Sequence, residues 1–186
     1  MADRLTKLAE KYRTDKCPKY GHSYTPYYNQ LFKGLKPRAL LEIGVGTTGT
    51  MGHVEGYQPG ASLRMWRDYF PDTMIYGCDI DPLVLFEENR IKTFVCDQTQ
   101  KKDLERVMHG VSKELDIIID DGSHNTGHQI STARQLLPSL SNTGIYVIED
   151  VHEPWEILYE LRDYSCSLES FAGISNVNDK LVIIRK

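Results

Sequence analysis

Acidic side chains follow two apolar stretches in the second half of the sequence, and these residue types could bind a cation. Asp120 and Asp121 end one stretch, and Glu149 and Asp150 come directly after the next. If both stretches are neighbouring parallel strands about 4.8 Å apart, the four carboxylates meet at one sheet edge. Carboxylates this close repel one another unless a cation intervenes, and an all-oxygen set suits Mg²⁺. The pattern predicts a magnesium site, although a lone Asp-Asp pair also occurs in solvated turns.

A histidine stands close to this acidic set. His124 follows Asp121 by three residues, on the turn toward the next expected helix. A hydroxyl bound to a divalent cation has a lowered pKa, and a neutral imidazole beside it can take the proton, so His124 is a candidate general base. We expect surface or packing roles for the other histidines, with His152 near enough to support Asp150; they are His22, His53, His109, His128 and His152.

Glycines after the first expected strand indicate a ligand-binding turn. Gly44, Gly46 and Gly49 form a literal GxGxxG, which by itself suggests a dinucleotide. The stretch that follows is glycine-rich, and the next helix is expected only near Ser62, so a pyrophosphate would lack its helix N-terminus. Glu42, two residues before the first glycine, would repel a diphosphate but accept hydrogen bonds from an ammonium group. S-adenosylmethionine (SAM) has such a group and no phosphate, so we expect SAM as cofactor.

Polar residues also end the second and third expected strands. Asp79 is placed to accept both hydroxyls of a ribose, a role common to SAM and NAD sites. Asp97 and Gln98 can take the adenine amino group and ring nitrogens, or they are simply turn residues. These positions fit an adenosine cofactor without deciding which one.

Apolar runs that alternate with amphipathic stretches are typical of βαβ units on a parallel sheet. We expect strands at 39–45, 74–79, 92–96, 115–120 and 145–148, and an antiparallel C-terminal hairpin at 166–172 and 180–185 with turn residues Asn176, Asn178 and Asp179. Helices are expected at 4–12, 26–35, 62–69, 102–108, 128–137 and 155–163, with Thr25 as N-cap before Pro26. The fold class is α/β, a Rossmann-like doubly wound seven-stranded sheet, mostly parallel.

Length, net charge and cysteine spacing limit the possible domain number, partners and cellular compartment. The 186 residues suit one domain, residues 1–186, in which the helical segment 1–38 contributes to the cofactor pocket. The net charge of -4, without a basic run, argues against nucleic acid as a partner. The four cysteines form no CxxC pair, and no stretch is apolar enough for a membrane span, so we expect a cytoplasmic protein without membrane contact.

Short motifs occur in order along nearly the whole chain. They are Asp15-Lys16, His22-Ser23-Tyr24-Thr25, and the segments 40–46, 61–71, 75–81, 91–94, 97–98, 117–124 and 144–152. This ordered set resembles the metal-dependent macrolide-sugar O-methyltransferases, the family of the mycinamicin and demethylmacrocin enzymes, within the class I SAM-dependent methyltransferases. The acid and base after the fourth strand and the two acids after the fifth also look like the catechol O-methyltransferase arrangement.

The resemblance implies Mg²⁺-dependent transfer of a methyl group from SAM to a hydroxyl of a sugar or glycoside. It implies SAM contacts from Thr25, Glu42, Gly44, Val45, Gly46, Ser62, Asp79, Asp97, Gln98 and Asp120. It also implies Mg²⁺ ligation by Asp121, Glu149 and Asp150, with His124 as base. The implied partner is a small sugar-containing acceptor, and a homo-oligomer is left open.

Three other functions stay open at this point. A metal-dependent O-methyltransferase of a phenol or catechol would share every residue named above. A NAD-dependent nucleotide-sugar enzyme is supported only by the literal GxGxxG, because Tyr12 and Lys16 have the Tyr-x-x-x-Lys spacing but precede the first strand. A non-catalytic SAM-binding subunit would not need His124 beside an acidic cluster.

Overall fold

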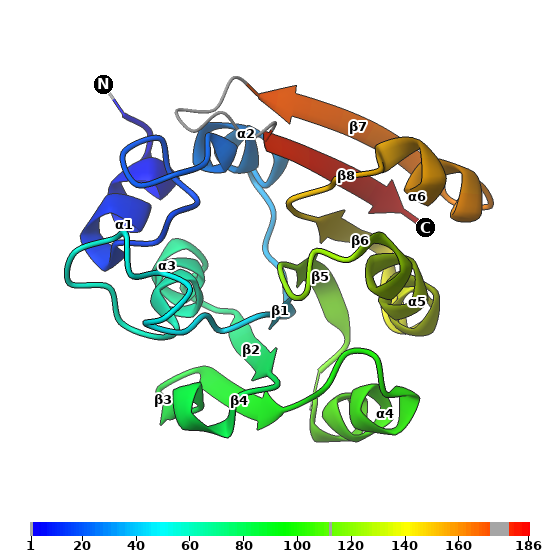
Figure 1. The fold of residues 1–186 in the computed structure, drawn as a ribbon, viewed down its shortest axis with the longest axis horizontal. Coiled ribbons are helices and arrows are strands. Elements are labelled where there is room, and N and C mark those ends of the chain that lie inside the picture. The colour runs from blue at the N-terminus through cyan, green and yellow to red at the C-terminus, as the bar shows by residue number, and fades with distance from the viewer. Residues whose placement is uncertain (1, 112, 172–178) are drawn as a thin grey trace.

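The computed structural model describes residues 2–111, 113–171 and 179–186, and its centre is an eight-stranded sheet with helices on both faces (Figure 1). The strands are β1 (Ala39–Ile43), β2 (Met74–Asp79), β3 (Glu87–Glu88), β4 (Ile91–Val95), β5 (Leu115–Asp120), β6 (Leu140–Ile148), β7 (Ser165–Phe171) and β8 (Asp179–Arg185). The α-helices are α1 (Arg4–Tyr12), α2 (Tyr24–Leu31), α3 (Ala61–Tyr69), α4 (Lys101–Gly110), α5 (Thr126–Leu136) and α6 (Pro154–Glu160). The α/β, doubly wound fold class is confirmed.

The strand order is β3-β4-β2-β1-β5-β6-β8-β7. β1 pairs in parallel with β2 and β5, β2 with β4, and β5 with β6, so the carboxyl ends of these five strands meet at one edge. β8 runs antiparallel between β6 and β7, which confirms the antiparallel C-terminal pair. Asp179 begins β8, whereas the expected turn residues Asn176 and Asn178 lie outside the described residues.

Two apolar layers hold the helices on the sheet. Side chains alternate between the faces of a strand, so Ile118 of β5 packs with Leu104 of α4, while Ile117 and Ile119 pack in the layer that contains Trp66 of α3. In Figure 1, α1, α2 and α3 cover one face and α4, α5 and α6 the other. Burial on both faces explains why these strands are almost wholly apolar. Within the described ranges, no helix has the length and apolar character needed to cross a membrane.

The strands differ from the prediction in number and length. The sheet has eight strands rather than seven, because the two-residue β3 pairs with the start of β4. Two residues are too few to produce a period-2 pattern, so β3 has no signal in the sequence. β6 begins at Leu140 rather than at Ile145, and its pairing with β5 shifts register between Leu115 and Ile117.

The second helix begins earlier than predicted. α2 starts at Tyr24 with Ser23 at the N-cap position, so the prediction of Thr25 as N-cap was wrong. Pro26 lies within the first helical turn, where N–H groups have no partner inside the helix and a proline is tolerated. The Thr25 N–H donates to the Lys16 carbonyl oxygen at 3.0 Å, which ties the segment between α1 and α2 to this helix.

Candidate active site

A cavity of about 770 Å³ lies at the carboxyl ends of the parallel strands. Its lining includes the expected cofactor residues Gly44, Val45, Gly46, Ser62, Asp79, Asp97 and Gln98, together with Asp121, His124 and Asp150. The N-terminal segment adds Thr14, Asp15, Lys16 and His22. The structure thus brings most of the predicted site residues around one space.

The turn after β1 is held by Asp79 at the end of β2. One Asp79 carboxylate oxygen accepts from the Val45 N–H at 2.8 Å and the Gly46 N–H at 3.3 Å, and the other accepts from the Asp81 N–H at 2.9 Å. Gly44 has φ +96°, and a Cβ there would lie 2.1 Å from the Asp121 carbonyl oxygen. Glycine is therefore required where β1 passes the end of β5.

Gln98 connects the ends of β4 and β5. Its Nε2 donates to Asp120 Oδ1 at 3.2 Å, and its Oε1 accepts from the Ser123 N–H at 2.7 Å. Asp120 is fully buried, and this burial raises its pKa to about 6 against the opposing effect of the hydrogen bond from Gln98. Asp97 Oδ1 accepts from the main chain and hydroxyl of Thr99, and these hydrogen bonds lower the pKa of Asp97.

Asp121, His124 and Asp150 converge at the cavity wall. His124 Nε2 lies 3.2 Å from Asp121 Oδ1 and 3.5 Å from Asp150 Oδ2. One potential ligand atom from each residue lies within 4.8 Å of the others, a spacing that suits one cation. His124 and Asp150 have φ +55° and +50°, a conformation that L-residues rarely adopt and that concentrates at functional sites.

Charge around this trio shifts its protonation. The hydrogen bond with Asp121 raises the pKa of His124 to about 9, although burial acts in the opposite direction. Burial alone would raise the pKa of Asp121, but the Lys16 ammonium and His124 outweigh it and lower that pKa. In the absence of a bound cation, His124 is therefore protonated and Asp121 ionised at neutral pH.

Glu149 is more deeply buried than Asp121 and Asp150. Its Oε2 lies 2.6 Å from Lys16 Nζ, its Oε1 accepts from the Tyr28 hydroxyl at 2.6 Å, and its carbonyl oxygen accepts from Gln129 Nε2 at 2.9 Å. Glu149 is 1% exposed and is not part of the cavity lining. Of the three predicted metal ligands, Asp121 and Asp150 therefore meet at the cavity and Glu149 lies behind them.

Three of the expected cofactor contacts lie behind the cavity wall. Thr25, Glu42 and Asp120 are fully buried and outside the lining. Glu42 Oε2 accepts from the Ser62 hydroxyl at 2.8 Å, and the buried Glu42 Oε1 lies 3.2 Å from Lys16 Nζ. Thr25 Oγ1 lies 2.9 Å from the Thr6 hydroxyl. Direct cofactor contact by these three residues stays a prediction. In the structure they lie behind the residues that line the cavity.

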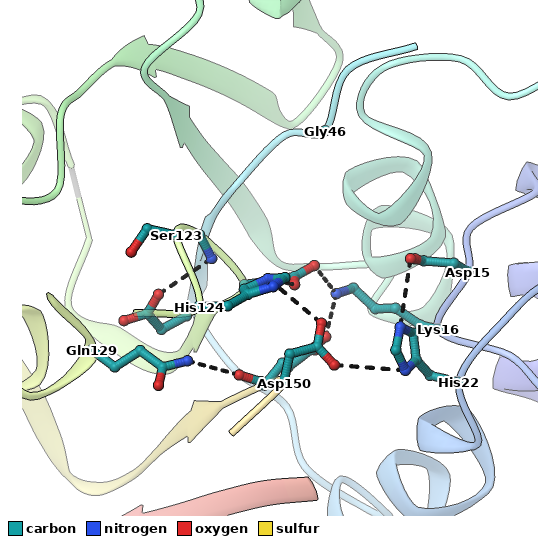
Figure 2. A network of polar contacts seen from close by, with 12 residues as sticks. Asp15, Lys16, His22, Gly46, Ser123, His124, Gln129 and Asp150 are labelled. Atoms are coloured by element: carbon teal, nitrogen blue, oxygen red, sulfur yellow. Dashed lines mark hydrogen bonds and ion pairs between the residues drawn. The ribbon is translucent and has the colours of Figure 1, made fainter. Parts of the chain in front are cut away.

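Lys16 and His22 are site residues that the sequence reasoning missed. Lys16 is 1% exposed and contacts Asp121 and Glu149, while His22 Nδ1 lies 3.0 Å from Asp179 Oδ1 and 3.6 Å from Asp150 Oδ1. Figure 2 shows His22 and His124 on opposite sides of Asp150. His22 also stacks on the Tyr24 ring, with centroids 4.8 Å apart, so the expected packing role is compatible with its place at the cavity. Lys16 and His22 belong to motifs that carried the family resemblance, which was the available signal.

The other histidines lie at the edge of this arrangement or away from it. His53 and His152 are exposed at the cavity lining, and His128 Nδ1 lies 3.0 Å from the Ser123 hydroxyl. His109 is exposed in the last turn of α4. His53, His109 and His152 are exposed, and the absence of a site role for His53 and His152, which line the cavity, stays a prediction.

The chain is similar in sequence to several curated sugar O-methyltransferases, although no family model matches it. An 8-demethyl-8-(2-methoxy-alpha-L-rhamnosyl)-tetracenomycin-C 3'-O-methyltransferase of Streptomyces olivaceus is 40% identical over 151 residues, which cover 79% of this chain and 36% of that protein. The mycinamicin VI 2''-O-methyltransferase of Micromonospora griseorubida is 38% identical with the same coverage. The chain thus spans little more than a third of the length of these curated relatives.

The structural comparison agrees with the sequence comparison. The MycE methyltransferase of mycinamycin biosynthesis, solved with Mg, SAH and mycinamycin VI, superposes with a TM-score of 0.76 at 28% identity. The match covers 99% of this chain and 54% of that one. By sequence and by fold, the chain is therefore related to the sugar O-methyltransferase family that these proteins represent.

Proposed function

We propose that the chain catalyses Mg²⁺-dependent transfer of a methyl group from SAM to a hydroxyl of a sugar or glycoside, with His124 as general base. The observation that carries the proposal is that one cavity contains both the Gly44–Asp79 end and the Asp121, His124 and Asp150 group. A donor and an acceptor in the same space can react directly. The relatives reported above support this assignment by their sugar O-methyltransferase activity.

The cofactor end fits SAM in its polar groups. The Asp79 carboxylate, which accepts from the Gly46 N–H at the cavity, is the proposed acceptor of the ribose hydroxyls, and Asp97 and Gln98, which also line the cavity, are the proposed adenine contacts. Glu42 is a buried carboxylate close to the glycine turn, and its Oε1 lies 3.2 Å from Lys16 Nζ. An acid at this turn favours a cofactor without a diphosphate.

The metal end fits a hard divalent cation. Asp121 and Asp150 present carboxylate oxygens to the cavity, and oxygen ligands are those that Mg²⁺ prefers. Glu149 is proposed as the third ligand, because a carboxylate oxygen can accept from more than one partner and so retains capacity beside Lys16 and Tyr28. Bound there, the cation would orient the acceptor hydroxyl, lower its pKa, and also lower the pKa of His124.

Three residues of the chain have further roles in the proposed reaction: His124, Asp121 and Asp150. His124 accepts the hydroxyl proton as the methyl group is transferred, and Asp121, 3.2 Å from its Nε2, orients the imidazole and stabilises its protonated form. Asp150 is fixed by the Tyr24 hydroxyl, which donates to its Oδ1 at 2.6 Å and leaves Oδ2 toward His124. The hydroxyl, its base and the carboxylates therefore meet in one place.

Transfer from labelled SAM to a panel of acceptors tests the proposal. Rhamnosides and other glycosides, nucleotide sugars and catechols should be compared with and without Mg²⁺, and we expect methylation of the sugar hydroxyls only when Mg²⁺ is present. Methylation of catechols alone would move the assignment to phenol O-methyltransferases. Calorimetric binding of NAD without binding of SAM would overturn it.

A further inference from the structure

Lys16 occupies the centre of the acidic cluster without taking part in the proposed chemistry. Its ammonium nitrogen lies 2.5 Å from Asp121 Oδ2, 2.6 Å from Glu149 Oε2 and 3.2 Å from Glu42 Oε1, and its side chain is 1% exposed. The three carboxylates follow or belong to β5, β6 and β1, so one cation contacts acids from three neighbouring strands.

We propose that Lys16 is a positioning residue, the internal counter-ion of the metal-free site. Its ammonium holds Asp121, Glu149 and Glu42 in place before a divalent cation binds, and it limits how tightly that cation is then held. The inference rests on the Mg²⁺ site of the proposed function.

The first half of this role follows from burial. Glu42 and Glu149 are at most 1% exposed, and a buried carboxylate without a compensating charge is strongly unfavourable. Further acids stand close by, since Asp150 and Asp179 both face His22 on the other side of the cluster. Without Lys16, the Glu42 and Glu149 carboxylates would lose their contacting ammonium, so the metal-free protein should be less stable.

The second half follows from the position of Asp121 between two cations. Asp121 Oδ2 faces Lys16, while its Oδ1 faces His124 and the proposed metal position. A divalent cation bound to Asp121 would therefore lie near the ammonium, and like charges repel most where water is excluded. Removal of the ammonium should strengthen cation binding, whereas a lysine with a purely structural role would leave cation affinity unchanged or weaken it on removal.

Calorimetric titration of Lys16→Met with Mg²⁺ at mildly alkaline pH tests the inference. We expect the Kd for Mg²⁺ to fall by about tenfold or more relative to wild type, while thermal unfolding in EDTA occurs at a lower temperature. Saturating Mg²⁺ should then stabilise the variant more than the wild type. Lys11→Met is the matched control, because Lys11 is 59% exposed and pairs with Asp68 at the surface. Lys16→Arg, which retains the charge, should keep nearly wild-type affinity.

The outcomes separate this inference from the proposed function. If the wild type binds Mg²⁺ as tightly as Lys16→Met does, or more tightly, the inference is wrong. The proposed function is not affected by that result. Absence of Mg²⁺ binding by the wild type overturns the metal site and the inference with it. If Lys16→Met does not fold, the double variant Lys16→Met/Glu149→Gln decides, since it removes a negative charge together with the positive one. Folding of the double variant supports the counter-ion role, and its failure overturns it.

Discussion

The imidazole of His124 is the proposed general base, and it lies beside Asp121 and Asp150 at the cavity wall. We expect His124→Ala to lower kcat by about 10²–10⁴-fold, the usual contribution of a positioned base, with little change in SAM affinity because His124 is on the acidic side of the cavity. Steady-state kinetics and calorimetry measure the two quantities. His109→Ala, at an exposed residue of α4, is the control. Wild-type turnover in His124→Ala would place the base elsewhere.

Titration of His124 gives a second, independent test. In metal-free protein its imidazole should titrate near pKa 9, because Asp121 and Asp150 stabilise the protonated form. Since a protonated ring cannot accept a proton, the rate of transfer should fall as the pH falls through the pKa of the loaded enzyme. Addition of Mg²⁺ should move this pKa downward. NMR of the His124 ring protons measures the pKa of His124 without and with Mg²⁺. A pKa near 6.5 that does not change when Mg²⁺ is added would contradict the assignment.

Sequence reasoning could find some site residues and not others. Asp121, His124 and Asp150 follow two strands that pair with each other, so adjacency of strand ends was enough to bring them together. Lys16 contacts acids that are 105 and 133 residues away in the sequence. Contacts over such separations cannot be predicted from a local sequence pattern. Lys16 lies in the turn-rich segment between α1 and α2, which has neither helical nor strand periodicity, so its place beside these acids could be known only from the structure.

The turn between β1 and the following loop is the element that joins the two ends of the cavity. Gly44→Ala should destabilise the fold by about 2–4 kcal/mol, because it combines a strained φ with a Cβ placed 2.1 Å from the Asp121 carbonyl oxygen. SAM binding should weaken as well, since the clash displaces the turn. Gly34→Ala is the matched control: it has φ +78° but no atom within 4 Å of the added Cβ, so about 1 kcal/mol is expected. Urea unfolding compares the two, and equal losses would show that the contact with Asp121 is unimportant.

The elements differ in how well their sequences specify them. β2 and β5 have the predicted boundaries, because each is a buried apolar run that ends in a polar residue at the sheet edge. α2 was misplaced because Pro26 is compatible with any position in the first helical turn, and the proline alone does not say which. β6 extends back to Leu140 through Gly144, and only pairing with β5 makes that irregular stretch a strand.

At the scale of the whole molecule, the cavity is assembled from segments that are distant in the sequence. Its lining runs from Thr14 and Lys16, through the glycine turn, to Asp150 and His152. A ligand bound there contacts both the N-terminal segment and the ends of the central strands. Binding should therefore be linked to the stability of the entire fold, because a ligand that binds only the folded chain raises its free energy of unfolding.

Metal removal tests this linkage and the proposed activity together. EDTA should abolish methyl transfer and lower the unfolding temperature, and Mg²⁺ should restore both, because Asp121 and Asp150 carry like charge in a site that a cation neutralises. At a Mg²⁺ concentration 100 times the Kd, the gain in the free energy of unfolding should be about 2.7 kcal/mol.

Asp150→Asn keeps the shape of the side chain but loses its charge. This variant should lose most of the stabilisation by Mg²⁺ and most of the methyl transfer while it still binds SAM, since Asp150 lies on the acceptor side. Calorimetry, thermal unfolding and labelled-methyl transfer give the three readouts. Full activity in chelator, or an equal stabilisation by Na⁺ at matched ionic strength, would show that the carboxylates act without a specific cation.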